Sequence, residues 1–408
     1  FVTAERMYVS GMSWSDSTST VLVVDISDPA GDLVEGASIE VAGSVESRWQ
    51  MDEHNGVFRT VTQPGFWGSS SPPVVETFEV RSSGEVVPLG TLEMTLPRPE
   101  DLRSVRFDGT RAYAVTFQRT DPLFTIDLSD PAAPVQKGEL EIPGWLYYMA
   151  PMGDRLVALG FEDDGSLAVS IFDVSDLAAP VMLDRVSFGG DWGWMPEDQD
   201  RIHKALNIMP ERGLILMPFA GFDYSSGRYG YNSGIQIIEL AGDDLVLRAV
   251  APHKGYARRA FLAGERLVVM SDERIDVFDI TDLDAPRRTD TLVLARTVYR
   301  IAPAGDRVAE LSSDWWTGEG RLEVLPMESP DSPQPEGSLD VSFLNEGEMD
   351  ESYYYWWSDF YYSDSILFAH GSSVILLWEE GFYAPDAGGY VTRTRTATFD
   401  ISDPASPV

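Results

Sequence analysis

The densest group of residues that could do chemistry is an aromatic and acidic stretch at 350–363. Its central residues are Tyr353, Tyr354, Tyr355, Trp356 and Trp357. Aromatic rings can stack on sugar rings or pack against a partner protein, while carboxylates accept hydrogen bonds from hydroxyl groups. The stretch therefore predicts a binding surface, with burial between strands as the alternative. Four more tryptophans would extend that surface if their loops share its face: Trp192, Trp194, Trp315 and Trp316.

Two acidic loops offer oxygen ligands for Ca²⁺. One contains Asp163 and Asp164, and the other contains Asp198 and Asp200. Ca²⁺ takes about six to eight oxygen ligands, often from a D-x-D-x-D-G loop, and neither loop has that spacing. Solvated hairpin tips are the alternative. His203 follows the second loop and could join a metal or acid–base site, or be a half-buried histidine near the start of a strand.

Motifs for catalysis are not recognisable in this chain. The four histidines stand at 54, 203, 253 and 370, without the spacing of a paired metal site. Neither a serine nucleophile with its base nor a repeated S-x-D-x-G box can be identified. The sequence therefore favours binding over catalysis, and Ca²⁺ is the only cofactor that we consider.

Composition narrows the choice of partners. The 408 residues contain 30 Lys and Arg against 66 Asp and Glu, which gives a formal net charge of -36. Such a surface repels nucleic acid and anionic lipid, and suits divalent cations, basic partners or a salty medium. Cysteine is absent, which excludes disulfides and thiolate metal sites. We expect no membrane span, because no apolar run approaches the ~20 residues that cross a bilayer.

The elements that must position these residues come from a repeated phrase. Its copies read VLVVDISDP at 21–29, LFTIDLSDP at 123–131, SIFDVSDL at 170–177, VFDITDL at 277–283 and TFDISDP at 398–404. Apolar β-branched residues before the Asp fit a buried strand, and Ser-Asp-Pro favours a tight turn. We therefore interpret these Asp residues as turn formers rather than ligands. Weaker copies end near Glu79, Glu239 and Pro326.

A second strand precedes each phrase, after a turn such as Gly153-Asp154-Arg155. The resulting units of ~40–50 residues with four strands are typical of a β-propeller, and no amphipathic helix separates the strands. Counting the phrases predicts an all-β propeller of four-stranded antiparallel blades, with eight blades favoured and seven as the alternative. We expect one domain over 1–408, in which 345–395 is an atypical aromatic and acidic insertion. The chain could also be part of a longer protein.

The central third of the chain carries family landmarks. They read SVRF at 104–107, RAYAVTF at 111–117, TDPLFTIDLSDP at 120–131, ELEIPG at 139–144 and HKA at 203–205. These segments resemble a family of secreted proteins that contain a C-terminal β-propeller domain. The similarity is looser at 18–63 and fades after about 300. The resemblance implies a secreted or envelope-attached propeller, and it implies no activity.

Three functions remain open at this point. The first is a non-enzymatic extracellular or cell-envelope scaffold that binds a protein or a glycan. The second is a metal-dependent, Ca-type hydrolase or lyase with carboxylates and His203 at the mouth of the propeller channel. The third is a structural subunit of a larger surface assembly. The first is favoured, because the chain combines repeat architecture with aromatic patches and lacks a catalytic motif.

Overall fold

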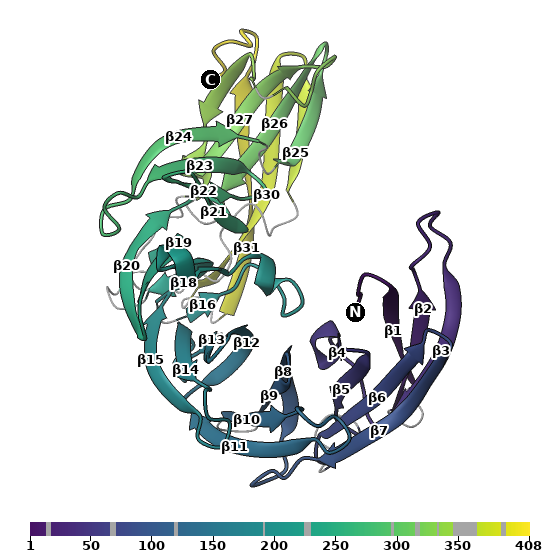
Figure 1. Cartoon of the computed structure of the whole chain (residues 1–408). Coiled ribbons are helices and arrows are strands. Elements are labelled where there is room, and N and C mark those ends of the chain that lie inside the picture. Colours follow the sequence, from purple (N-terminus) through teal and green to yellow (C-terminus); the bar gives the residue numbers. More distant parts are fainter. Residues whose placement is uncertain are drawn as a thin grey trace. The chain divides into compact units, whose positions relative to one another are not determined.

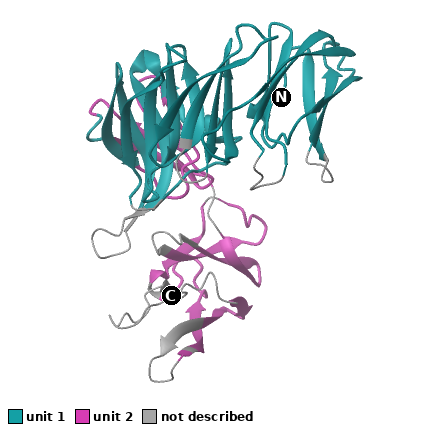
Figure 2. Ribbon diagram, turned by 90° about the horizontal axis from the view of Figure 1, so that it is seen from below, with its two compact units in different colours: residues 1–251, 283–285 teal, residues 252–282, 286–408 magenta. Residues whose placement is uncertain are grey.

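The computed structural model describes residues 1–13, 18–65, 71–117, 121–190, 192–223, 230–294, 298–314, 319–332, 334–345, 365–384 and 389–408 (Figure 1). Among these residues the chain forms two compact units (Figure 2). Unit 1 comprises 1–251 and 283–285, and unit 2 comprises 252–282 and 286–408. The expectation of a single domain over 1–408 stays a prediction. No helix in the described part of the chain is long and apolar enough to cross a membrane.

Unit 1 holds five antiparallel sheets, each built from strands that follow one another in the chain. The first two contain β1 (Arg6–Ser13), β2 (Thr18–Asp25) and β3 (Val34–Val41), then β4 (Met51–His54), β5 (Val57–Thr62), β6 (Val74–Ser82) and β7 (Glu85–Glu93). The next two contain β8 (Asp101–Asp108), β9 (Arg111–Phe117), β10 (Asp121–Asp127) and β11 (Val135–Ile142), then β12 (Trp145–Met152), β13 (Arg155–Phe161), β14 (Leu167–Asp173) and β15 (Val181–Phe188). The fifth contains β16 (Trp192–Trp194), β17 (Asn207–Met209), β18 (Leu214–Asp223), β19 (Gly230–Ala241) and β20 (Asp244–Pro252).

Unit 2 holds three further sheets of the same kind. They contain β21 (Arg259–Ala263), β22 (Arg266–Met270), β23 (Arg274–Asp279) and β24 (Arg287–Val293), then β25 (Val298–Ala304), β26 (Arg307–Asp314), β27 (Glu319–Pro326) and β28 (Gly337–Asp340), then β29 (Ile366–His370), β30 (Ser373–Ala384) and β31 (Gly389–Asp400). Four short 3-10 helices complete the described elements: η1 (Arg48–Gln50), η2 (Ile202–Lys204), η3 (Pro210–Arg212) and η4 (Ser342–Asn345).

The repeated phrase forms the turn after one strand of every sheet in which it occurs. Its first Asp ends β2, β10, β14, β23 and β31, and accepts a hydrogen bond of 2.8–3.1 Å from the backbone N–H two residues later. The second Asp of four copies, Asp28, Asp130, Asp176 and Asp403, does the same at 2.8–3.2 Å. The interpretation of these Asp residues as turn formers is confirmed. The Ser27 hydroxyl and backbone N–H lower the pKa of Asp25 to about 2.

The core of unit 1 lies between successive sheets. Four clusters of buried apolar side chains each combine residues of two neighbouring sheets, from β1–β7 through to β12–β20. In Figure 1 the sheets follow a curve, with β4, β8 and β12 on its inner side and β7, β11 and β15 on its outer side. Sheets that pack face to face in this way, each from consecutive strands, are the blades of a β-propeller. The inner strands therefore bring distant parts of the sequence together.

Unit 2 shows the same construction. A cluster of buried apolar side chains joins the β25–β28 sheet to the β29–β31 sheet, with Leu311 and Trp378 among its members. In the β21–β24 sheet, Asp276 lies fully buried and accepts hydrogen bonds from Thr291 at 2.6 Å and from the ring of His253 at 2.8 Å. Burial alone would raise the pKa of Asp276, but these hydrogen bonds lower it below its usual range.

The predicted fold class is confirmed: the structure is all-β, and its described residues form eight sheets. Six of them contain at least four strands, whereas the first and last contain three. Val408 exchanges two backbone hydrogen bonds with Asp400, the last residue of β31. The same pairing occurs in a four-stranded sheet, where Val181, the first residue of β15, pairs with Asp173, the last residue of β14. The expected insertion at 345–395 supplies β29, β30 and part of β31, and its residues 346–364 and 385–388 lie outside the described ones.

Candidate functional site

Unit 1 contains a cavity of about 570 Å³ that is lined by aromatic and acidic side chains. It lies between the start of β12, the turn that joins β13 to β14, and the segment that begins with β16. Its lining residues are Trp145, Tyr147, Phe161, Asp163, Asp164, Gly165, Gly193, Trp194, Met195 and Glu197. The volume and the mixture of aromatic and polar groups are typical of ligand-binding sites.

One wall of the cavity is a cluster of aromatic rings from a single hairpin. Trp145 stands opposite Phe161 in the pairing of β12 with β13, and their rings stack with centroids 4.9 Å apart. Tyr147 lies two residues after Trp145 and contacts Phe161 edge-on at 6.3 Å. Both β12 aromatic rings contact Phe161, so they lie on the same side of the sheet. All three side chains are half-buried, which leaves part of each ring accessible.

A second wall is the tight turn between β13 and β14. The Gly165 N–H donates to the Glu162 carbonyl at 3.0 Å, and Gly165 has a φ of 89°, which favours glycine. Asp164 accepts hydrogen bonds from the backbone N–H of Ser166 at 2.9 Å and from its hydroxyl at 2.7 Å. These bonds lower the pKa of Asp164 and hold the turn rigid. Asp163 forms no hydrogen bond or ion pair with any described residue, so its carboxylate is available to a ligand.

The third wall begins with β16 and is held against the second. The backbone N–H of Gly193 donates to the Gly165 carbonyl at 3.1 Å. A Cβ atom at position 193 would lie 2.7 Å from Cγ of Leu167, so only glycine allows this approach without a shift. Trp194, half-buried, follows directly and lines the cavity together with Met195 and Glu197. The walls are thus assembled before any ligand arrives.

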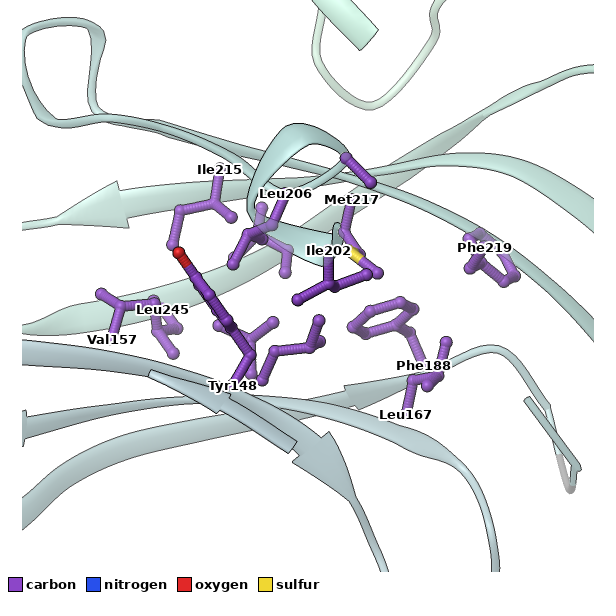
Figure 3. Close-up of a cluster of buried hydrophobic side chains, with 14 of the residues drawn as sticks. Tyr148, Val157, Leu167, Phe188, Ile202, Leu206, Ile215, Met217, Phe219 and Leu245 are labelled. Atoms are coloured by element: carbon purple, nitrogen blue, oxygen red, sulfur yellow. The ribbon is translucent and has the colours of Figure 1, made fainter. Parts of the chain in front are cut away.

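The loop after this wall is fastened to three earlier sheets or their connections. The Gln199 side-chain amide donates to the carbonyls of Arg103 and Tyr147 at 2.9 Å each, and the Gln199 backbone carbonyl accepts from the Trp49 indole N–H at 3.2 Å. Ile202 of η2 is fully buried, and Figure 3 shows it among Phe188 and other apolar side chains of the cluster. The loop therefore holds the third wall in place from outside the cavity.

Beside this loop, cationic and aromatic side chains alternate on the inner side of unit 1. The guanidinium carbon of Arg106 lies 3.5 Å from the Trp49 ring centroid and 4.5 Å from that of Tyr148, while Arg48 lies 4.2 Å from Trp49. Burial and repulsion from Arg48 lower the pKa of Arg106 to about 10, so it stays charged at neutral pH. Cation–π contacts of this kind join η1, β8 and β12.

Comparison with known proteins agrees with the architecture. A family model described as "Beta propeller domain" matches residues 1–283, which is more than half of the chain. The chain belongs to the β-propeller domain family. The match ends before β24, close to residue 300, after which the similarity seen in the sequence fades.

Two relatives of this propeller are archaeal. An uncharacterized protein of Methanocaldococcus jannaschii, MJ1554, is 38% identical over 162 residues, covering 40% of this chain and 26% of that protein. An uncharacterized protein of Archaeoglobus fulgidus is 28% identical over 239 residues, covering 59% of this chain and 34% of that protein. The propeller thus aligns with about a quarter to a third of the length of these relatives.

Solved structures with a similar chain trace have low sequence identity. Sqt1 of Saccharomyces cerevisiae is 9% identical with a TM-score of 0.45, covering 76% of this chain and 79% of that one. Hydrazine synthase of Kuenenia stuttgartiensis is 11% identical with a TM-score of 0.36, covering 78% of this chain and 94% of that one. At these TM-scores we infer nothing about this propeller from either protein.

The predicted metal ligands lie in two places, the turn with Asp163 and Asp164 and the loop with Asp198, Asp200 and His203, and Ca²⁺ binding stays a prediction. Among the described residues, no three His, Asp or Glu side chains form a group that could hold a metal ion. Asp198 accepts from the Arg201 N–H at 3.0 Å and Asp200 from the Ser47 hydroxyl at 2.7 Å, so both support the loop. His203 lies 2.9 Å from an Arg48 guanidinium nitrogen, and burial together with Arg48 and Lys204 lowers its pKa. Cationic neighbours disfavour a metal ion there, whereas Asp163 and Asp164 line the aromatic cavity instead.

The predicted aromatic surface is only partly described. Trp194 lines the cavity, whereas nothing is described of the Trp192 side chain or of Trp315, Trp316 and 353–357. Their role as a binding surface stays a prediction. Sequence reasoning missed Trp145, Tyr147 and Phe161, although the Trp-Leu-Tyr spacing at 145–147 places two rings on one face of a strand. That spacing was the signal that could have found them.

Proposed function

We propose that this chain is a non-enzymatic β-propeller that binds a protein or glycan ligand in the aromatic and acidic cavity of unit 1. The observation that supports it most is the convergence of Trp145, Phe161, Trp194 and Asp163 on one cavity of about 570 Å³. Rigid aromatic side chains contribute contact area at a low entropic cost, and carboxylates orient a ligand by hydrogen bonds or charge.

Preorganisation of the walls favours a binding role. The turn at 162–166 is closed by its own hydrogen bonds, and the Gly193–Gly165 hydrogen bond joins it to the segment that starts with β16. A site that is rigid before binding loses little conformational entropy when a ligand arrives. Asp163 and the four half-buried aromatic side chains then provide the contacts.

The location that we propose is outside the cell or at the cell envelope. It is supported by the resemblance of the segment 104–205 to secreted proteins with a β-propeller domain. The net charge of -36 is compatible with an exposed, hydrated surface. A role as a subunit of a larger surface assembly would use other faces of the same propeller and stays a prediction.

The proposed function is tested by comparing the wild-type chain with a Trp194→Ala variant on glycan and peptide arrays. Denaturation curves of both proteins first establish that the variant is folded. We expect one class of array ligand to bind the wild type and to bind the variant at least about 10-fold more weakly, because an aromatic contact in the cavity is lost. Equal binding by both proteins, or no binding by the wild type to any array, would contradict the proposal.

A further inference from the structure

The charged groups that line the aromatic cavity are all negative. Asp163, Asp164 and Glu197 line it, and no Lys, Arg or His is found among its described lining residues. Arg185 lies nearby, but its guanidinium is bound to Glu162 at 2.7 Å, which offsets its charge. The charge of the described lining residues therefore has the same sign as that of the whole chain.

Two further carboxylates, Asp198 and Asp200, lie near the aromatic wall without lining the cavity. Asp164 stays ionised because hydrogen bonds from Ser166 lower its pKa. The Tyr147 phenol has a raised pKa, because it is buried and because Asp198 and Asp200 disfavour a second negative charge beside them.

Aromatic rings add attraction for a cation. The face of an aromatic ring carries negative charge density, and a guanidinium or ammonium group close to it is stabilised, most strongly by Trp. The cavity has two tryptophans, Trp145 and Trp194, with Tyr147 and Phe161. On the inner side of the same unit, Trp49 and Tyr148 already hold the side chain of Arg106 in this manner.

We infer that the cavity takes the cationic end of a Lys or Arg side chain that a partner protein presents. This inference rests on the proposed function and names its ligand class. The Asp163 carboxylate, which has no partner among the described residues, meets the charge, and the rings of Trp194, Trp145 and Phe161 surround the apolar stem. A neutral sugar would stack on the rings and donate hydroxyl hydrogen bonds to Asp163, but it carries no charge to neutralise that carboxylate. The volume of about 570 Å³ also accommodates flanking peptide backbone.

The test uses blocked peptide libraries with one fixed Arg or Lys, matched libraries with citrulline or Gln at that position, and a panel of neutral glycans. Citrulline keeps the shape of Arg and removes its charge. We expect the full chain to bind the basic libraries, more weakly as salt is raised, and to bind the citrulline and Gln libraries at least about 5-fold more weakly. Asp163→Asn should weaken binding about 2- to 5-fold, as expected for one exposed ion pair. Asp32→Asn, a change of equal charge at an exposed position outside the cavity, is the matched control and should have no effect.

The outcomes separate the ligand class from the site itself. If the citrulline libraries or neutral glycans bind as well as the basic ones, and Trp194→Ala abolishes that binding, the ligand class is wrong and the cavity remains a binding site. If the wild type binds none of the probes, or if Trp194→Ala leaves all binding unchanged, the inference and the proposed function both fail. Asp163 lies on an exposed turn, so the Asp163→Asn variant should fold and its effect on binding can be measured.

Discussion

Replacing Ile202 by Ala tests whether the loop after β16 is packed as the structure shows. Ile202 is fully buried in the cluster shared by the β12–β15 and β16–β20 sheets. The substitution removes three buried carbon atoms, worth about 0.8 kcal/mol each, or about 2.4 kcal/mol in transfer free energy. The cavity that remains adds to this, so we expect a loss of about 3 kcal/mol in the free energy of unfolding of unit 1.

Urea denaturation followed by tryptophan fluorescence measures this loss. Ile202→Val removes one carbon and should lose about 1 kcal/mol, which grades the effect by size. Ile301→Ala is the matched control, because the Ile301 side chain is 59% exposed, and it should change the free energy by less than about 0.5 kcal/mol. A loss below about 1 kcal/mol for Ile202→Ala would refute the reasoning, because η2 could then not be part of the core. Since this loop directly follows the third wall of the cavity and holds it in place, ligand affinity should fall in the same variant.

Three further predictions concern the turns, unit 2 and the cavity. Hydrogen bonds lower the pKa of Asp25 in the folded chain to about 2. The ionised Asp25 therefore stabilises the folded chain fully at a pH above its unfolded pKa near 4, and this stabilisation is lost as the pH falls through 2. The melting temperature of Asp25→Ala should therefore lie below that of the wild type at pH 7, with a difference that shrinks as the pH falls from about 4 to about 2; a constant difference would contradict this. Asp276→Ala removes the carboxylate that accepts hydrogen bonds from His253 and Thr291 inside unit 2. In denaturant unfolding it should lower the free energy of unfolding of unit 2 by about 2–4 kcal/mol. The same substitution at the exposed Asp272 should leave that free energy unchanged. Gly193→Ala places a Cβ 2.7 Å from Leu167 and should lower stability by about 1–3 kcal/mol in the same assay, while Gly84→Ala, with open space around it, should be neutral.

The blade pattern could be predicted because its signals are local. Each Asp of the repeated phrase bonds to a backbone N–H only two residues away, so the turn is encoded within the phrase itself. The eight third strands counted near 25, 79, 127, 173, 239, 279, 326 and 400 each correspond to a strand of a different sheet: β2, β6, β10, β14, β19, β23, β27 and β31. The division of the described chain into two compact units was not anticipated, because packing between sheets involves residues that are far apart in the sequence.

The candidate site was predicted only in parts. Trp194 was assigned to a binding surface, and Asp163 and Asp164 were assigned to a metal site. The structure places the three at one cavity, because the Gly193–Gly165 hydrogen bond brings the segment of β16 against the turn between β13 and β14. The contact between these two segments depends on how two blades pack and on the space left by the missing side chain of Gly193. Neither can be recognised from the residues next to Gly193 in the sequence.

A crystal structure of the chain with a bound Arg-containing peptide tests the central claim most directly. The peptide would be the tightest binder of the basic library, soaked or co-crystallised with the wild type. We predict that the guanidinium lies within hydrogen-bond distance of Asp163 and against the rings of Trp194 or Phe161. A peptide bound elsewhere, for instance against the aromatic stretch 350–363 with the cavity free of peptide, would contradict the account.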